Sequence, residues 1–540
     1  MYPPSSSSYR SVACHRTVAN VVNNNIKYLL HLFTVSEKTN MNFCFQIKKT
    51  YLSNMCVDDC TSNRFFHTPP IKKNPSFHSS SLNTMSIVRQ SLYRHVFGEP
   101  YKNEFTYLNI RPNVGAWDSN WLAANALFVA VPWQGGGGSV AVLNQKNVGK
   151  QSADLPLVSG HTGAVLDLKF HPFNQYILAT GSVDTTAKIW VLPQEGLTQS
   201  MTEAQVTLEG HMKKVGLLEF HPTANNVLLT AGQDHKVVLW DIENGKAQVE
   251  MKDLWKDIQS VSFNKNGSLF ASTSKDKKLR IIDPRKGSVA MEAEGHSGTK
   301  GSRVQWITNG DKIFTVGFSK TSERQYMYWD PRNLEKPINT TNIDMASGLI
   351  MPFYDPDTNL LFLAGKGDGN IRFYELTNEE PYIHSLSEFR STDPQMGMAM
   401  LPKIAVDTTT NEIVRLFKLT ANQITPISFT VPRKSELFQS DIYPKTASPT
   451  PSLSASDYFS GQDADPTLVS MNPEDKEIDV QQFKDFKPNV EVKAKPPKTV
   501  LPKVVSNPQE LQKQNEELRA RVEALEKENW ELKQELKKYQ

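Results

Sequence analysis

Short apolar runs separated by turn residues fill the chain from about residue 90 to residue 430. In the segment from Gly160 to Trp190, which reads GHTGAVLDLKFHPFNQYILATGSVDTTAKIW, the apolar runs are Val165–Phe170, Ile177–Thr180 and Lys188–Trp190. Runs of this length, bounded by glycine, proline, asparagine and aspartate, predict β-strands. We therefore expect this part of the chain to be all-β.

The same unit returns fifty residues later along the chain. The segment from Gly210 to Trp240 reads GHMKKVGLLEFHPTANNVLLTAGQDHKVVLW. In both units the aspartate follows the histidine by 23 residues and the tryptophan follows it by 29. This repeat is typical of a propeller blade of the WD-repeat type, which is a four-stranded antiparallel sheet.

Weaker copies of the unit extend the repeat in both directions. They cover Ile258–Ile282, Gly295–Asp330, Ser347–Tyr374, an earlier unit over Arg111–Leu143 and a last one at roughly 384–425. Together with the two clear units they predict a seven-bladed β-propeller. We expect a strand from Val88–Phe97 to complete the last blade, because closing the ring with strands from both ends removes the free sheet edges.

Composition divides the rest of the chain into separate segments. Residues 1–84 are rich in serine and asparagine, show no sustained period and are predicted to be disordered. The propeller with its C-terminal packing segment is expected over residues 85–444. Proline, serine, threonine, aspartate and lysine dominate residues 445–506, which predicts a flexible linker.

Residues 507–540 carry a heptad pattern that predicts an oligomerising parallel coiled coil. Leucine recurs every seventh residue at the d positions, namely Leu511, Leu518, Leu525 and Leu532, while Val522 and two asparagines occupy a positions. In a parallel bundle Arg521 faces Glu526 of a neighbouring chain. Leucine at d with asparagine at a is also compatible with a dimer, but the Arg521 stem can cover Val522 and Leu525, which favours a trimer.

Charge and cysteine content exclude several classes of protein. The 540 residues carry a net charge of +3, of which residues 1–84 contribute +6, with nine Lys/Arg and three Asp/Glu. The remainder is close to neutral, so neither a nucleic-acid-binding nor a membrane-surface protein is indicated. No apolar run is long enough for a transmembrane helix. All four cysteines precede residue 85, and Cys56 and Cys60 lack a second ligand pair for zinc.

Side chains that resemble catalytic groups recur at the same positions of the repeat. The set is His161, Thr180, Asp184 and Trp190 in one unit and His211, Thr230, Asp234 and Trp240 in the next. A constellation repeated in successive blades is expected to be a hydrogen-bonded structural network, because buried polar groups need partners. The GKGDG sequence at Gly365–Gly369 lacks the lysine and hydroxyl residue of a phosphate loop and predicts a tight turn. We therefore expect no enzymatic activity, cofactor or metal.

Four further segments of the chain are distinctive, namely MSIVRQSLYRHVFGEP at Met85–Pro100, GFSKTSERQ at Gly317–Gln325, PFYDPDTNLLFLAGKGDGNIRFYE at Pro352–Glu375 and VPRKSELFQSDIYP at Val431–Pro444. Together these segments resemble the coronins, and the resemblance covers Met85 to about Pro444 and resumes in the predicted coiled coil. The resemblance implies a seven-bladed propeller, binding to actin filaments, contact with the branching complex built on actin-related proteins, and cooperation with actin-severing cofilin. It also implies a cytoplasmic protein of the actin cytoskeleton and cell cortex.

The resemblance also implies roles for individual residues. Arg111 matches the family's arginine that is needed for filament contact, and RVEALE at Arg521–Glu526 fits the family's trimer signature, which implies a homotrimer. Residues 1–84 depart from the pattern, since family members start near Met85. The alternative hypothesis is a generic WD-repeat scaffold, such as a substrate receptor of a ubiquitin ligase or a trafficking adaptor. A propeller hydrolase is a more distant third.

Overall fold

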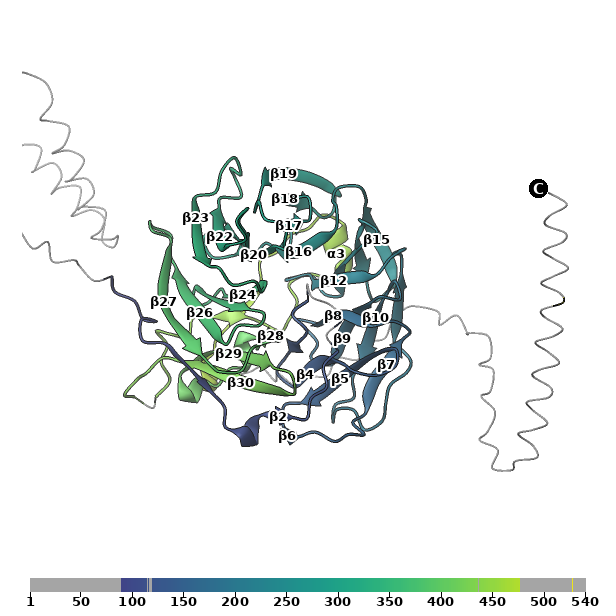
Figure 1. Cartoon of the computed structure of the whole chain (residues 1–540), viewed down its shortest axis with the longest axis horizontal. Helices are drawn as coiled ribbons and strands as arrows, with labels where there is room; N and C mark the ends of the chain where they lie inside the picture. Colours follow the sequence, from purple (N-terminus) through teal and green to yellow (C-terminus); the bar gives the residue numbers. More distant parts are fainter. Residues whose placement is uncertain (1–88, 114, 116–118, 436, 476–526, 528–540) are drawn as a thin grey trace, which may run out of the picture. The chain divides into compact units, whose positions relative to one another are not determined.

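Figure 1 shows the computed structural model of the chain, which describes residues 89–113, 115, 119–435, 437–475 and 527. The chain divides into two units, residues 1–88 and 89–540, and the described residues belong to the second. The disorder expected for residues 1–84 and the coiled coil expected for residues 507–540 therefore lie outside the described residues, apart from Lys527, which is helical.

The first three blades are regular four-stranded antiparallel sheets. Blade one contains β3 (Ala123–Ala124), β4 (Phe128–Trp133), β5 (Gly138–Asn144) and β7 (Leu157–His161). Blade two contains β8 (Val165–Phe170), β9 (Ile177–Ser182), β10 (Thr186–Val191) and β11 (Val206–Glu209). Blade three contains β12 (Val215–Phe220), β13 (Val227–Gly232), β14 (Val237–Asp241) and β15 (Lys246–Met251).

The next three blades repeat this arrangement. Blade four contains β16 (Ile258–Phe263), β17 (Phe270–Ser274), β18 (Lys278–Asp283) and β19 (Ser288–Glu294). Blade five contains β20 (Arg303–Ile307), β21 (Lys312–Phe318), β22 (Arg324–Trp329) and β23 (Asn339–Asp344). Blade six contains β24 (Ile350–Asp355), β25 (Leu360–Gly365), β26 (Asn370–Leu376) and β27 (Ile383–Arg390).

The seventh blade joins the two ends of the propeller. Its strands β28 (Gly397–Met400), β29 (Glu412–Leu419) and β30 (Gln423–Thr430) pair in that order, and β30 also pairs with the N-terminal β1 (Phe97–Pro100). The short strands β2 (Tyr107–Leu108) and β6 (Gly149–Lys150) extend the sheet. In Figure 1 the blades surround a common centre, and the first strands that are labelled there, β8, β12, β16, β20, β24 and β28, lie innermost. The predicted all-β, seven-bladed fold is therefore confirmed.

Burial explains why the repeat folds in this way. The second strands, such as β9, β13 and β25, are buried along their whole length because a neighbouring blade covers each of their faces. The outer strand β19 is mostly exposed. Inner strands therefore read as continuous apolar runs, whereas outer strands are polar and harder to recognise in the sequence.

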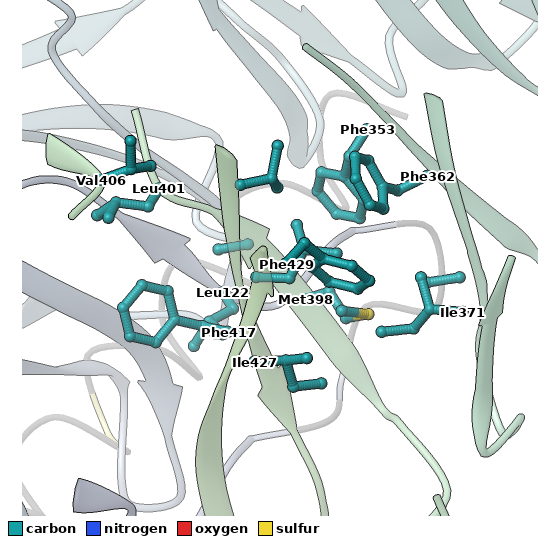
Figure 2. Close-up of a cluster of buried hydrophobic side chains, with 14 of the residues drawn as sticks. Leu122, Phe353, Phe362, Ile371, Met398, Leu401, Val406, Phe417, Ile427 and Phe429 are labelled. Carbon is teal, nitrogen blue, oxygen red and sulfur yellow. The ribbon is translucent and has the colours of Figure 1, made fainter. Parts of the chain in front are cut away.

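The closing strand differs from the one expected. We predicted that Val88–Phe97 would complete the last blade, but β1 begins at Phe97 and pairs with β30. The residues before it pack instead of pairing, since Tyr93 and Val96 are buried in the apolar core of the closing blades. Figure 2 shows this core, in which the rings of Phe362 and Phe429 meet edge to face with their centroids 4.7 Å apart.

Two blade boundaries also differ from the prediction. The unit expected over Arg111–Leu143 begins only at β3, and Leu157–His161 supplies its fourth strand. The unit expected at 384–425 begins at β28, because the residues of β27 complete blade six instead. Both errors come from polar outer strands, which lack the apolar pattern of the inner ones.

Residues 445–475, here called the C-terminal arm, pack against the propeller. They contain β31 (Thr446–Ala447), α3 (Ala455–Phe459), β32 (Leu468–Val469) and the 3-10 turn Pro473–Asp475. Tyr458 is fully buried, with its ring centroid 4.2 Å from that of His221. The prediction of a flexible linker is therefore wrong for residues 445–475, because Ala455 and Tyr458 complete an apolar cluster with Trp255. The rest of that predicted linker lies outside the described residues.

Candidate functional site

Blade two places its predicted polar set in one hydrogen-bonded network. The Nδ1 of His161 lies 2.8 Å from Oδ2 of Asp184, and its Nε2 lies 2.8 Å from Oγ1 of Thr180. The indole N–H of Trp190 donates to the same hydroxyl at 2.8 Å. Since His161 ends β7 and Asp184 lies in the β9–β10 turn, the network ties the connection between two blades to the turn between two strands.

Blade three repeats the network with nearly the same distances. The Nδ1 of His211 lies 3.0 Å from Oδ1 of Asp234, its Nε2 lies 2.8 Å from Oγ1 of Thr230, and Trp240 donates to that hydroxyl at 2.8 Å. An added Cβ on Gly232 would stand 2.5 Å from the His211 ring, so the glycine leaves the space that the network needs. The structure thus brings both predicted sets together.

Blade five holds a variant that the sequence repeat did not reveal. His296 and Trp329 share the hydroxyl of Thr315 at 3.0 Å each, but the side-chain amide of Gln325 replaces the aspartate, 3.2 Å from Nδ1 of the histidine. Gln325 lies in β22 and not in the turn, so the spacing of the other blades could not identify it.

The electrostatics of these networks fit a structural role. Burial lowers the pKa of His161 and of His211, so both rings are neutral near pH 7. Burial alone would raise the pKa of Asp184, but hydrogen bonds from Thr186 and His161 hold it at about 2. The Thr180 hydroxyl, which a catalytic reading would make the nucleophile, is fully buried and already receives a hydrogen bond from Trp190.

Arg111 lies at the end of the blades that carries these networks. Its carbonyl accepts a hydrogen bond from the backbone N–H of Gln134 at 2.8 Å, beside the β4–β5 turn, and Pro112 forms a bridge with Trp133. That turn joins the second and third strands of its blade, as do the turns of Asp184 and Asp234 in theirs. The Arg111 side chain is exposed, and it forms no ion pair with the residues that the structure describes.

Lysines gather at the same end of blades three and four. Lys213 and Lys214 follow His211, and the Lys214 carbonyl accepts from Gln233 in the β13–β14 turn. Lys256 precedes β16, and its carbonyl lies near the N–H of Lys275 in the β17–β18 turn, which also contains Lys277. We call Lys213, Lys214, Lys256, Lys275 and Lys277 the cationic strip. Our sequence analysis did not single out these residues, although each stands at an inter-blade connection or a second-to-third-strand turn.

The part of the chain that the structure describes offers neither a metal-binding cluster nor a membrane-spanning helix. No cluster of three or more His, Cys, Asp or Glu side chains there is arranged to hold a metal ion. No helix there has the length and apolar character required to cross a bilayer. Cys56 and Cys60 lie outside the described residues, and so do the predicted coiled-coil residues Leu511, Leu518, Arg521, Val522, Leu525, Glu526 and Leu532. Self-association therefore stays a prediction.

Three family models match the chain. Residues 86–150 match a domain of unknown function designated DUF1899. Residues 154–191, 202–241 and 254–283 match the WD domain, G-beta repeat, and residues 424–466 match a type of WD40 repeat. The WD40-repeat match at 424–466 spans nearly all of β30 and residues 445–466 of the C-terminal arm, which agrees with the packing of that arm on the propeller.

Three relatives are similar to this chain over most of its length. Coronin-like protein crn1 of Schizosaccharomyces pombe is 45% identical over 72% of this chain and 65% of its own length, so the match spans less than two thirds of that relative. Coronin-2A of Homo sapiens is 42% identical over 71% of this chain and 75% of its own. Coronin-A of Dictyostelium discoideum is 45% identical over 82% of this chain and 96% of its own.

A solved structure agrees with these relationships. The crystal structure of the WD40 domain of Toxoplasma gondii coronin superimposes with a TM-score of 0.67 and 34% sequence identity. The alignment covers 71% of this chain and 98% of that domain. At this level of identity the likeness extends beyond the general propeller architecture.

Proposed function

This chain belongs to the coronin family, and from that premise we propose that it is a non-catalytic protein that binds actin filaments and regulates their dynamics. The observation that carries the proposal is the position of Arg111. It is exposed at the end of the blades where the inter-blade connections gather, and the described residues offer it no ion-pair partner. A guanidinium in this setting is available to a carboxylate of another protein.

The binding face includes Arg111 and the cationic strip. A guanidinium can grip a carboxylate through two parallel hydrogen bonds, whereas an ammonium acts as a single point charge. Arg111 therefore fixes the orientation on the acidic filament, and Lys213, Lys214 and Lys256 add attraction over a wider area. Because Arg111, Lys213 and Lys256 are exposed and Lys214 is half-buried, the interaction is screened by salt and should weaken as the ionic strength rises.

The predicted tail supplies the remaining proposed contacts. RVEALE at Arg521–Glu526 supports a homotrimer, which presents three propellers to one filament and strengthens a weak contact through avidity. We also propose that the tail contacts the branching complex built on actin-related proteins, and that the protein cooperates with cofilin at the cortical cytoskeleton. These proposals rest on the family resemblance of the sequence.

Co-sedimentation with actin filaments tests the proposed function. Full-length protein should pellet with filaments in a saturable manner at moderate salt, and the pelleted fraction should fall as salt is raised. A chain ending at residue 475 keeps the C-terminal arm and removes the predicted coiled coil, so it should bind more weakly but measurably. Full-length folded protein that stays in the supernatant at every filament concentration would contradict the proposal.

A further inference from the structure

A cavity of about 590 Å³ lies between blades six and seven. Blade six contributes Phe373 from β26 and Phe389 from β27, and blade seven contributes Lys418 from β29 and Thr425 from β30. Phe97 of the closing strand β1 lines it as well. This volume falls within the range typical of small-molecule sites in proteins.

Lys418 is an unusual residue to find in such a cavity. Its side chain belongs to a residue that is only 2% exposed, and Nζ makes no hydrogen bond to the residues that the structure describes. The centroid of the Phe389 ring lies 6.0 Å from Nζ, at the outer limit of a cation–π contact. Burial lowers the pKa of Lys418 to about 8, an effect that Asp393 opposes. The ammonium is therefore mostly protonated near pH 7.

Lys403, also in blade seven, is a lysine whose ammonium has hydrogen-bond acceptors within the protein. The Nζ of Lys403 lies 2.6 Å from Oδ2 of Asp355 and 2.7 Å from the carbonyl oxygen of Ile413. Lys418 is more deeply buried than Lys403, yet it has neither a carboxylate nor a carbonyl partner among the described residues. A buried charge without an acceptor is costly, so an acceptor that enters the cavity gains more from this group than from an exposed lysine.

The remaining lining selects the kind of acceptor. Thr420 and Thr425 line the cavity together with Phe97, Phe373 and Phe389, and the Thr420 hydroxyl already donates to the carbonyl oxygen of Gln423 at 3.3 Å. Two acidic side chains also line the cavity. Glu388 is paired with Arg390, and Asp393 is exposed. The paired carboxylate leaves Lys418 as the cation that lacks a bonded acceptor inside this cavity.

We propose that the cavity between blades six and seven binds an oxyanion, either carboxylate or phosphate, carried on a flat apolar group, with Lys418 as its charge partner. The phenylalanine rings hold the apolar part, and the Thr425 hydroxyl donates to a remaining oxygen. This site is separate from the proposed filament-binding residues and stands whether or not the protein binds actin.

Ligand-observed NMR titration of the full chain tests the proposal with three related probes. Sodium benzoate and phenyl phosphate carry the two candidate oxyanions, and benzyl alcohol has the same ring without the charge. Benzoate or phenyl phosphate should bind, and the tighter of the two identifies the preferred oxyanion. Benzyl alcohol should bind at least tenfold more weakly, since its neutral hydroxyl cannot form a charge-assisted hydrogen bond as strong as that of an oxyanion.

Two substitutions should change the affinity in opposite directions. Lys418→Met keeps the length and removes the charge, and should weaken binding of the preferred oxyanion by about tenfold or more. Asp393→Asn removes a competing negative charge and should tighten it. Lys246→Met, an exposed lysine of blade three, serves as the matched control and should change nothing.

Four results would overturn the proposal. The first is that neither oxyanion binds the folded wild-type chain. The second is that benzyl alcohol binds as tightly as benzoate, which would make the cavity an apolar pocket. The third is that Lys418→Met, shown to be folded by its melting curve, binds with unchanged affinity. The fourth is that Asp393→Asn binds the oxyanion no more tightly than the wild type does. If Lys418→Met does not fold, the Asp393→Asn measurement tests the proposal in its place.

Discussion

The side-chain amide nitrogen of Gln325 lies 3.2 Å from Nδ1 of His296, where blades two and three place an aspartate opposite the histidine. Blade five therefore keeps the hydrogen-bonded network, with the neutral Gln325 in place of an aspartate as the partner of the histidine. A hydrogen bond from an amide fixes the ring, but it lacks the charge-assisted strength of the Asp184 and Asp234 contacts. In all three blades both ring nitrogens of the histidine have hydrogen-bond partners, so the imidazole is fixed in place, as a structural role requires.

Loss of the histidine from one of these networks should lower the stability of the propeller and leave filament binding unchanged. His211→Ala leaves Thr230 and Asp234 without their partner, and we expect a loss of about 1–3 kcal/mol in the free energy of unfolding. Urea denaturation measures this loss. His95→Ala changes an exposed histidine and should have little effect. Filament co-sedimentation by the folded His211→Ala chain should match the wild type. A His211→Ala chain with unchanged stability would contradict the structural role.

Acid should destabilise the propeller through its buried histidines. Burial lowers the pKa of His171 and His221 to about 3 and that of His296 to about 4. The unfolded chain binds these protons near pH 6.5, so each contribution is complete above pH 6.5 and is lost as pH falls towards 3–4. Each histidine contributes about 1.4 kcal/mol per pH unit within that window. Burial raises the pKa of Asp357 to about 6, which opposes part of the effect.

Urea unfolding at several pH values between 7.5 and 5 tests this prediction. The free energy of unfolding should fall below pH 6.5, and His221→Gln should reduce the slope by about one proton. Stability that remains constant or rises as pH falls from 6.5 to 5 would show that the buried histidines do not control the acid response.

The C-terminal arm should contribute directly to the stability of the propeller. Tyr458 packs on His221 and under the guanidinium of Arg285, 5.2 Å from its ring centroid. Tyr458→Ala removes a fully buried ring, and we expect a loss of about 3–5 kcal/mol. Leu468→Ala in the same arm is the control, because Leu468 is half exposed. Equal melting temperatures for Tyr458→Ala and the wild type would mean that the arm adds nothing.

The predicted tail should determine both the oligomeric state and the contact with the branching complex. Light scattering on the full chain should give the mass of three chains, whereas a chain ending at residue 475 should be a monomer. Arg521→Ala should weaken the trimer, since it removes the predicted partner of Glu526. The shortened chain should no longer retain the branching complex in pull-downs. A stable dimer, or retention of the complex by the shortened chain, would contradict these expectations.

The inner strands of the propeller were predictable because both of their faces are buried. Val165–Phe170 and Ile177–Thr180 read as apolar runs in the sequence, and they lie in β8 and β9 of the structure. The outer strand β1 has no such pattern, and three of its four residues are polar, glycine or proline. Its place was therefore predicted a few residues too early, in a segment whose Tyr93 and Val96 pack into the core instead.

The site residues divide in the same way. His161 and Asp184 could be predicted because the repeat fixes their spacing. Gln325 could not, because the same contact is reached from a different position of the blade. The environment of Lys418 depends on two strands of blade six that are distant in sequence, so no local pattern marks it as buried. The packing of Tyr458 could not be predicted from the sequence either, because the proline and serine residues around it are typical of a flexible linker.

The charge reversal Arg111→Asp, measured by co-sedimentation with actin filaments, tests the central claim most directly. Arg332→Asp provides the matched control, because Arg332 is also exposed but lies in the β22–β23 connection, at the opposite end of the blades. With melting temperature and oligomeric mass unchanged, Arg111→Asp should lose most of its filament binding, Arg111→Lys should fall between it and the wild type, and Arg332→Asp should bind normally. Filament binding by folded Arg111→Asp that equals the wild type would contradict the account.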